Sequence, residues 1–153
     1  PMKEFLEKEI KHNPGIIVHA DSGKNIGTHD GLAFYTIGQR QHLTTSAGQT
    51  EAWYVVDKNQ ETNTLIIGPK DSPGLWKTKI TLEKTHWISG QTPQFPLQCK
   101  VRLRHGQTLR SATITSVNNQ TIVTFVEPEW GVTPGQFTVF YHHNFCLGGG
   151  IIT

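Results

Sequence analysis

The side chains with the clearest chemical potential form one short basic segment, Lys100-Val101-Arg102-Leu103-Arg104-His105. Side chains of a strand alternate between its two faces, so the three cations of this segment would share one face. The phosphates of an RNA backbone are attracted by such local positive charge even where net charge is small. The segment therefore predicts RNA contacts from Lys100, Arg102, Arg104, His105 and the nearby Arg110, although a solvated outer strand face would show the same alternation.

A second polar cluster, Gly38-Gln39-Arg40-Gln41-His42, directly follows an aromatic segment. Amide and guanidinium groups can bond phosphate, ribose or base edges, which makes Gln39 and Arg40 candidate RNA contacts. An ordinary exposed loop has the same composition, and this alternative stays open.

Metal binding and catalysis find little support in the residue spacing. The eight histidines include no HExxH pattern and no paired Cys/His spacing, and a strand would point His142 and His143 to opposite faces. Cys146 would need one of these histidines as a base to act as a nucleophile. The run Gly148-Gly149-Gly150 lacks the Lys-Ser/Thr of a phosphate loop and indicates close backbone packing instead. We predict no metal site and no catalytic residue in this chain.

The two cysteines, Cys99 and Cys146, lie far apart in the sequence and form no CxxC motif. The chain also shows no secretory signal that would indicate an oxidising compartment. We therefore expect both to be buried, reduced thiols.

Length and composition leave the number of domains open. The chain has 153 residues, 35% of them hydrophobic, and a formal net charge of only +2. One domain or two small β modules would fit this length. No apolar run approaches the roughly 20 residues of a membrane helix, so we expect a soluble protein without a membrane partner. The start, Pro1-Met2, indicates a piece of a longer chain.

The first part of the chain shows one helical pattern and then turn-linked strands. Apolar residues at helical spacing predict a short helix over residues 2–11, which Asn13-Pro14-Gly15 ends. Residues 16–18 and 26–27 would form a hairpin around a polar turn. Residues 32–37 fit either a strand or a short helical turn.

The rest of the chain reads almost entirely as strands. Residues 53–57 and 64–68 flank a polar turn and predict a second hairpin, because both flanks are rich in β-branched or aromatic residues. After a linker over 69–74, short strands with turns between them predict a closed antiparallel barrel or a sandwich. These strands are expected at residues 79–82, 97–103, 111–117, 121–125, 137–141 and 146–152.

Several segments together resemble the tRNA-specific 2-thiouridylase (MnmA-type) family. They are the run from Gly31 to Arg40, the run from Trp53 to Lys58, the segment from Glu127 to Tyr141 that contains Thr133-Pro134-Gly135-Gln136, and the glycine-rich end from Cys146 to Ile152. Their order and spacing match over nearly the whole chain. The resemblance implies a mainly β fold: a small central β domain with a short N-terminal helix over residues 1–72, followed by a C-terminal antiparallel β-barrel over residues 73–153.

The resemblance also implies a parent enzyme larger than this chain. In that family, ATP with magnesium activates the wobble uridine of tRNA by adenylation, and a cysteine persulfide then delivers the sulfur. The ATP site and both catalytic cysteines belong to an upstream ATP-pyrophosphatase domain of the same chain, and a separate protein donates sulfur. Cys99 and Cys146 do not inherit these roles, so this chain alone is expected to hold no cofactor and to be inactive.

By the same resemblance, Arg104 and His105 fall on an arginine-aromatic pair that contacts tRNA, and Gln136 falls on another tRNA contact. His105 stands where a tyrosine is expected, so we expect weaker stacking there. The leading hypothesis is a tRNA-binding and tRNA-positioning role for this chain within a cytoplasmic thiolating enzyme. The alternative is a structural module that packs on the catalytic domain and hardly touches RNA.

Overall fold

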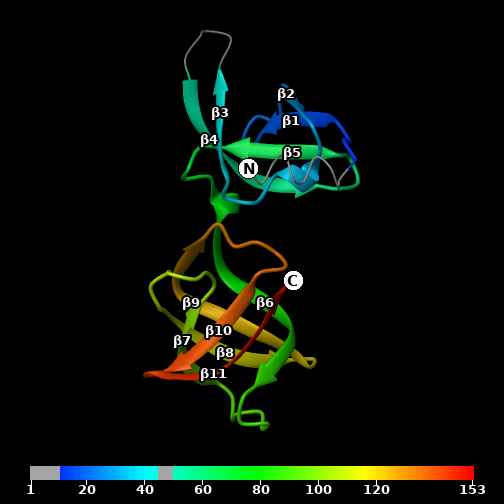
Figure 1. The fold of residues 1–153 in the computed structure, drawn as a ribbon. Helices are drawn as coiled ribbons and strands as arrows, with labels where there is room; N and C mark the ends of the chain where they lie inside the picture. The colour runs from blue at the N-terminus through cyan, green and yellow to red at the C-terminus, as the bar shows by residue number, and fades with distance from the viewer. Residues whose placement is uncertain (1–10, 45–49) are drawn as a thin grey trace. The chain divides into compact units, whose positions relative to one another are not determined.

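A computed structural model describes residues 11–44 and 50–153, which form two compact units, Pro1–Leu75 and Trp76–Thr153. Both units are built from strands (Figure 1), so the mainly β fold class is confirmed. The predicted N-terminal helix over residues 2–11 lies, apart from Lys11, outside the described residues. The units divide after Leu75, and the assignment of domains to residues 1–72 and 73–153 stays a prediction.

The first unit is a five-stranded sheet with the strand order β2-β1-β5-β4-β3. Both predicted hairpins are present, as the antiparallel pairs β1/β2 and β4/β5, and β1 runs parallel to β5. Residues 32–37, left open by the sequence, begin with the 3-10 helix η1 (Leu32–Phe34), and a second one, η2 (Pro73–Leu75), ends the unit. The strands are β1 (Gly15–His19), β2 (Asn25–His29), β3 (Arg40–Thr44), β4 (Thr50–Asn59) and β5 (Thr64–Gly68).

One small hydrophobic core stabilises this sheet. Ile17, Val55, Leu65 and Ile67 come from three adjacent strands, and Leu32 from η1 packs against them. Val55, Leu65 and Ile67 are completely buried. The β-branched side chains suit the pleated surface of a sheet, so propensity and burial favour the same structure here.

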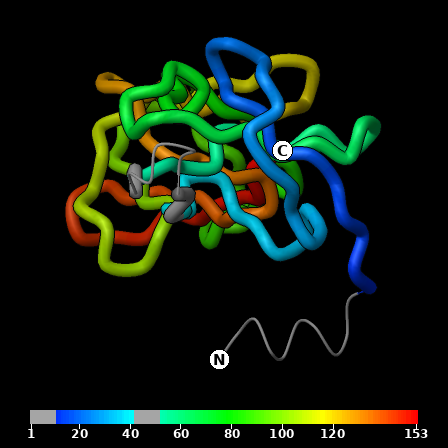
Figure 2. The backbone as a smooth tube through the Cα atoms, turned by 90° about the horizontal axis from the view of Figure 1, so that it is seen from above, coloured from blue at the N-terminus to red at the C-terminus, as the bar shows by residue number. Residues whose placement is uncertain are grey.

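The second unit is a closed six-stranded barrel with the order β10-β11-β6-β9-β8-β7, in which β10 pairs with β7 to close the ring. All its pairs are antiparallel, which confirms the predicted barrel. The path of the backbone can be followed in Figure 2. The strands are β6 (Trp76–Trp87), β7 (Leu97–Arg102), β8 (Arg110–Val117), β9 (Gln120–Trp130), β10 (Phe137–His142) and β11 (Phe145–Ile152).

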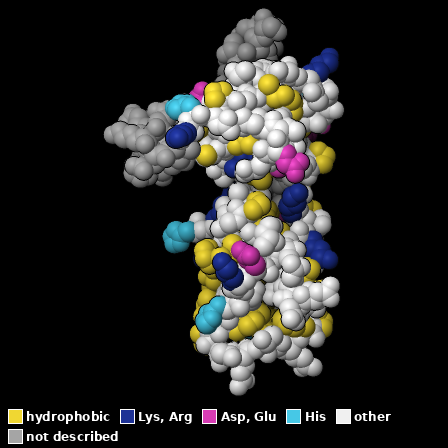
Figure 3. Space-filling view, turned by 90° about the vertical axis from the view of Figure 1, so that its right-hand side faces the viewer, with side chains coloured by type: hydrophobic (Ala, Val, Ile, Leu, Met, Phe, Trp, Pro, Cys, Tyr) yellow, Lys and Arg dark blue, Asp and Glu magenta, His cyan; other side chains and the backbone are white. Residues whose placement is uncertain are grey.

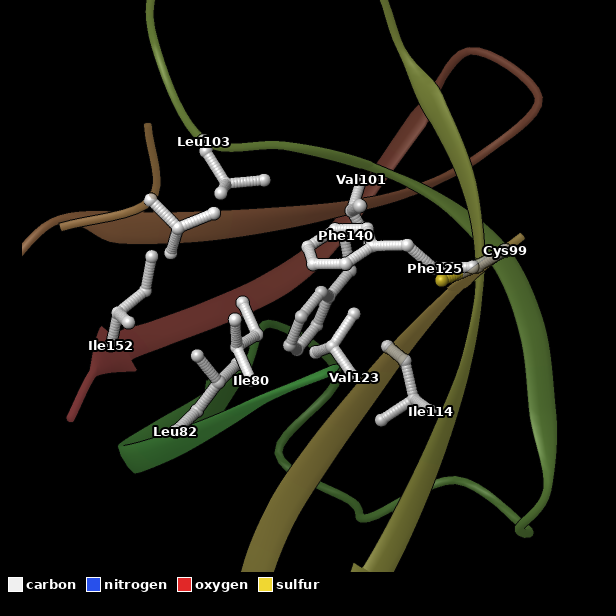
Figure 4. Close-up of a cluster of buried hydrophobic side chains, with 12 residues drawn as sticks. Ile80, Leu82, Cys99, Val101, Leu103, Ile114, Val123, Phe125, Phe140 and Ile152 are labelled. Carbon is white, nitrogen blue, oxygen red and sulfur yellow. The ribbon is translucent and has the colours of Figure 1, made fainter. Parts of the chain in front are cut away.

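Alternation along the strands fills the barrel with apolar side chains. Val101, Ile114, Val123 and Phe140 are completely buried, and they converge in the interior with their neighbours (Figure 4). Because every second side chain points inward, the residues between them face outward and are free to carry polar groups. The barrel thus positions a set of outward side chains on a rigid, packed frame.

Turn residues and glycines set the connections and the closest backbone approaches. Asn118 and Asn119, with φ of 49° and 63°, form a tight turn between β8 and β9, since asparagine tolerates this left-handed conformation. A Cβ on Gly148 would overlap the carbonyl oxygen of His86 on the neighbouring strand. The glycine run therefore serves close packing of β11, as the sequence indicated.

Candidate nucleic-acid interface

The outward face of β7 carries two of the predicted cations. Cys99 and Val101 are buried in the barrel, so Lys100 is exposed on the opposite face and Arg102 is half-buried there. The Arg102 guanidinium carbon lies 5.6 Å from the ring centre of Tyr141 on β10, which is within the range of a cation–π interaction. The predicted alternation is therefore present as far as Arg102.

Arg104 lies in the turn after β7, so the shared strand face ends before it, contrary to the expectation from alternation. The side-chain carbonyl of Gln107 accepts hydrogen bonds from the backbone N–H of Leu103 at 3.0 Å and of Arg104 at 3.2 Å. The backbone N–H of Gln107 donates to the carbonyl of Arg104 at 3.1 Å, and His105 is exposed at the tip of this turn. Gln107 thus fixes the backbone that presents Arg104 and His105.

The side chain of Arg104 reaches a second turn that is far away in the sequence. Its guanidinium donates a hydrogen bond to the carbonyl of Gly131. The same carbonyl accepts from the Thr133 hydroxyl at 3.3 Å, and the backbone N–H of Thr133 donates to the side-chain Oε1 of Gln136 at 3.3 Å. The fold therefore joins the Arg104 and Gln136 turns into one polar cluster, which we call the two-turn cluster (Arg104, His105, Gly131, Thr133 and Gln136).

A buried carboxylate, that of Glu129, bonds the Gln107 side chain that holds the Arg104 turn. Glu129 on β9 has 9% of its side chain exposed, accepts a hydrogen bond from Gln107 Nε2 at 2.5 Å, and pairs with Arg110 Nε at 2.9 Å. Glu127 also approaches Arg110, at 3.9 Å. The sequence signal was the acidic pair Glu127 and Glu129, but only the pairing of β8 with β9 shows that Arg110 neutralises it.

The ion pairs of Arg110 separate it from the other predicted cations. Its side chain is 34% exposed and faces two carboxylates, so much of its charge is compensated within the protein. On the face seen in Figure 3, Lys, Arg and His side chains stand dispersed among uncharged ones. On this face the basic side chains are therefore separated from one another.

The remaining predicted contacts, Gln39 and Arg40, belong to the first unit. The side-chain Oε1 of Gln39 accepts the backbone N–H of Thr36 at 2.9 Å, and its backbone carbonyl accepts the N–H of Val55 at 3.0 Å. Arg40 begins β3 opposite Tyr54 and is exposed. Gln39 therefore holds its own turn, while the Arg40 guanidinium faces solvent.

The two cysteines differ in their exposure to solvent. Cys99 is buried, as predicted, and this burial raises the pKa of its thiol to about 11 against the opposing effect of a hydrogen bond with the Tyr141 backbone. Cys146 is exposed, so the expectation that it is buried was wrong. The reason is its place at the start of β11, on the outer side of the strand beside the exposed β10–β11 turn.

The two adjacent histidines were also expected on opposite faces, and this expectation was wrong. The ring centres of His142 and His143 lie 4.4 Å apart. Strand β10 ends at His142, and His143 adopts a left-handed turn conformation with φ of 51°, so the alternation of a strand does not apply to this pair. Within the described residues, no group of three or more His, Cys, Asp or Glu side chains could hold a metal ion, and no helix is long and apolar enough to cross a membrane.

Comparisons with known proteins give a consistent result for both units. Residues 3–69 match the family model of a tRNA methyl transferase PRC-barrel domain, and residues 77–152 match that of an aminomethyltransferase beta-barrel domain. The tRNA-specific 2-thiouridylase MnmA of Pseudoalteromonas translucida is 41% identical over 98% of this chain and 42% of its own length. The MnmA of Photobacterium profundum is 42% identical over 97% of this chain and 41% of its own length, and that of Nitrosomonas eutropha 38% identical over 100% and 44%. The chain thus spans about two fifths of the length of these relatives.

Proposed function

The chain belongs to the tRNA-specific 2-thiouridylase family, of which it represents the central and C-terminal domains, and from this membership we propose that it binds and positions tRNA for thiolation of the wobble uridine. The catalytic partner in this proposal is an ATP-pyrophosphatase domain upstream in the same protein, in the cytoplasm. A separate protein supplies the sulfur as a persulfide.

The observation that carries this proposal is the two-turn cluster. Arg104, His105 and Gln136 were assigned to tRNA from separate parts of the sequence, and their turns are joined through Gly131 and Thr133. Arg104 and Gln136 have limited freedom, because their side chains already hold the turn backbone. Such preorganised guanidinium and amide groups can bond phosphate and ribose with little loss of side-chain entropy, and the exposed His105 imidazole lies in the same turn as Arg104.

Lys100 and Arg102 extend the proposed interface along β7 with two further phosphate contacts. Gln39 and Arg40 contribute contacts from the first unit in the same proposal. Arg110 contributes to RNA binding indirectly in this proposal, since its guanidinium already pairs with Glu129 and Glu127. It holds the Glu129 carboxylate, which in turn accepts a hydrogen bond from Gln107.

The proposal assigns no ATP site to the described residues. Phosphate groups of ATP are held by glycine-rich loops at helix N-termini, whereas the helices of the described residues are two 3-10 turns of three residues each. The buried Cys99, whose pKa is raised to about 11, is also unsuited to carry a persulfide, because the thiolate is the reactive form. On the family membership, the proposal assigns ATP, magnesium and the catalytic cysteines to the upstream domain, and it assigns no catalytic residue here.

The alternative function, a structural module with little RNA contact, draws on two observations. Two carboxylates compensate Arg110, and net charge is only +2. In that case the exposed cations of β7 would simply be solvated, and their removal would leave RNA affinity unchanged.

Fluorescence anisotropy with a wobble-uridine tRNA over a series of salt concentrations distinguishes the two functions. Each phosphate contact contributes about 0.7–0.9 to the slope of log affinity against log salt, so Arg104→Ala should lower both affinity and slope. Lys79→Ala, which removes an exposed cation of β6, is the matched control and should change neither. Unchanged affinity and slope in a folded Arg104→Ala variant would support the structural module instead.

A further inference from the structure

A depression on the outer surface of the barrel lies where β7, β8 and β10 run side by side. Its volume is about 750 Å³, and the polar residues of its lining include Lys100, Ser111, Tyr141, His142, His143 and Asn144. Tyr141 stands directly opposite Lys100 in the pairing of β10 with β7, and Lys100 opposite Ser111 in the pairing of β7 with β8. We call this depression the β10 groove.

The charges of the β10 groove favour an anionic ligand. Its lining contains the ammonium group of Lys100 and two imidazoles, and no Asp or Glu belongs to it. Arg110 has the opposite surroundings, since two carboxylates face it. A cation whose charge is not compensated inside a concave surface attracts anions more strongly than one in an ion pair.

The imidazole pair supplies directional groups in the same place. The rings of His142 and His143 are 65° apart in orientation with centres at 4.4 Å, a geometry that the left-handed turn at His143 produces. Within the described part of the chain, neither ring nor the Lys100 ammonium makes a hydrogen bond or an ion pair. Imidazole nitrogens and an ammonium group can therefore donate to a phosphate without breaking an existing interaction.

Tyr141 adds a planar element beside these donors. Its ring is half-buried, and the Arg102 guanidinium lies 5.6 Å from the ring centre. Tyrosine rings and guanidinium planes are the surfaces on which unstacked RNA bases pack, and the 2′-hydroxyl of ribose can bond to histidine or asparagine side chains. A groove with phosphate donors next to such a surface suits a nucleotide within an RNA chain.

We propose that the β10 groove binds the phosphate and the adjoining base or ribose of one RNA nucleotide, as a second contact beyond the two-turn cluster. This inference rests on the proposed RNA-binding function. The two sites stand at opposite ends of β10, since Gln136 precedes that strand and His143 follows it. Six residues of strand span about 20 Å, and Arg102 and Lys100 lie between the ends on the adjacent strand, so the two contacts would be parts of one path for the RNA backbone.

The test uses the whole chain with three variants: His142→Ala/His143→Ala, the matched control His86→Ala on β6, and Arg104→Ala. Histidine side-chain NMR signals are followed during titration with a single-stranded oligoribonucleotide, and affinity for tRNA is measured by anisotropy. We expect the signals of His142 and His143 to shift, that of His86 to stay, and the double variant to bind RNA about 5–20-fold more weakly. Inorganic phosphate and AMP at the same concentrations should produce much smaller shifts.

Three results would overturn the inference in different ways. RNA binding that depends on Arg104, with unmoved His142 and His143 signals and wild-type affinity of the double variant, would refute the β10 groove and leave the proposed function standing. Shifts of equal size with inorganic phosphate would refute recognition of an RNA nucleotide. Absence of any RNA binding would refute the proposed function together with this inference.

Discussion

Replacement of Glu129 by glutamine tests how the two-turn cluster is held in place. Glu129 is buried and bonds both Gln107 and Arg110. A glutamine at this position keeps one oxygen acceptor, but its amide group would face the donors of Arg110. The variant therefore loses the charge-assisted bond to Arg110 while the bond to Gln107 can persist.

The size of the effect follows from this one lost bond. Hydrogen bonds to charged groups contribute about 1.5–3 kcal/mol to stability. Because the Arg110 side chain is 34% exposed, water replaces part of the interaction, and we expect a loss near the lower end, about 1.5–2 kcal/mol. The barrel unit, Trp76–Thr153, falls within the size range of about 60–100 residues, for which this loss of stability corresponds to a fall in Tm of about 6–16 °C.

Thermal unfolding and amide hydrogen exchange measure the two consequences. In Glu129→Gln, the barrel should melt earlier. The amides of Leu103 and Arg104 should also exchange faster, because the neutral amide oxygen that remains at position 129 holds the Gln107 side chain less firmly than a carboxylate does. Glu127→Gln is the control: that carboxylate is 78% exposed and 3.9 Å from Arg110, so its loss should change stability by less than about 0.5 kcal/mol. Equal melting temperatures for the two variants would show that the network does not hold the turn.

Four further outcomes are expected. Phe140→Ala should destabilise the barrel by about 3–5 kcal/mol in denaturant unfolding, because this ring is completely buried and leaves a cavity; a loss below about 1 kcal/mol would contradict the packing. A thiol reagent at pH 8 should label Cys146 rapidly and Cys99 only after unfolding, and equal rates would refute the burial of Cys99. The folded state holds the Cys99 proton more tightly than the unfolded chain, because burial raises the pKa of this thiol from 9.0 to about 11. The free energy of unfolding should therefore be unaffected by this thiol below pH 9 and should fall as pH rises from about 9 towards 11. In Cys99→Ser, the free energy of unfolding should fall less over the same pH range. Purified chain with tRNA, ATP and a persulfide donor should give no thiolated tRNA by mass spectrometry, and any product would overturn the assignment of catalysis to an upstream domain.

The sequence by itself determined most of the strand content. Runs such as Thr64–Gly68 and Arg110–Val117 alternate or cluster β-branched residues, and this local pattern is present before any tertiary contact forms. The tight turn at Asn118 and Asn119 was also readable, because asparagine is among the few residues that tolerate its conformation. The inward and outward faces of β7 up to Arg102 followed from the same two-residue period. Motif order and spacing added the family resemblance.

The tertiary structure alone decided which of these residues meet. The contacts of Glu129 with Gln107 and Arg110, and of Arg104 with Gly131, join segments about 20 residues or more apart, and they depend on strand register and barrel closure. The exposure of Cys146 and the edge-to-face contact of His142 with His143 depend on the turn between β10 and β11, which the strand pattern does not describe. Local periodicity reports the face on which a side chain lies, because it reflects backbone geometry within one strand. Which side chains contact each other depends on how different strands pair, and that pairing is set by the packing of the whole barrel core.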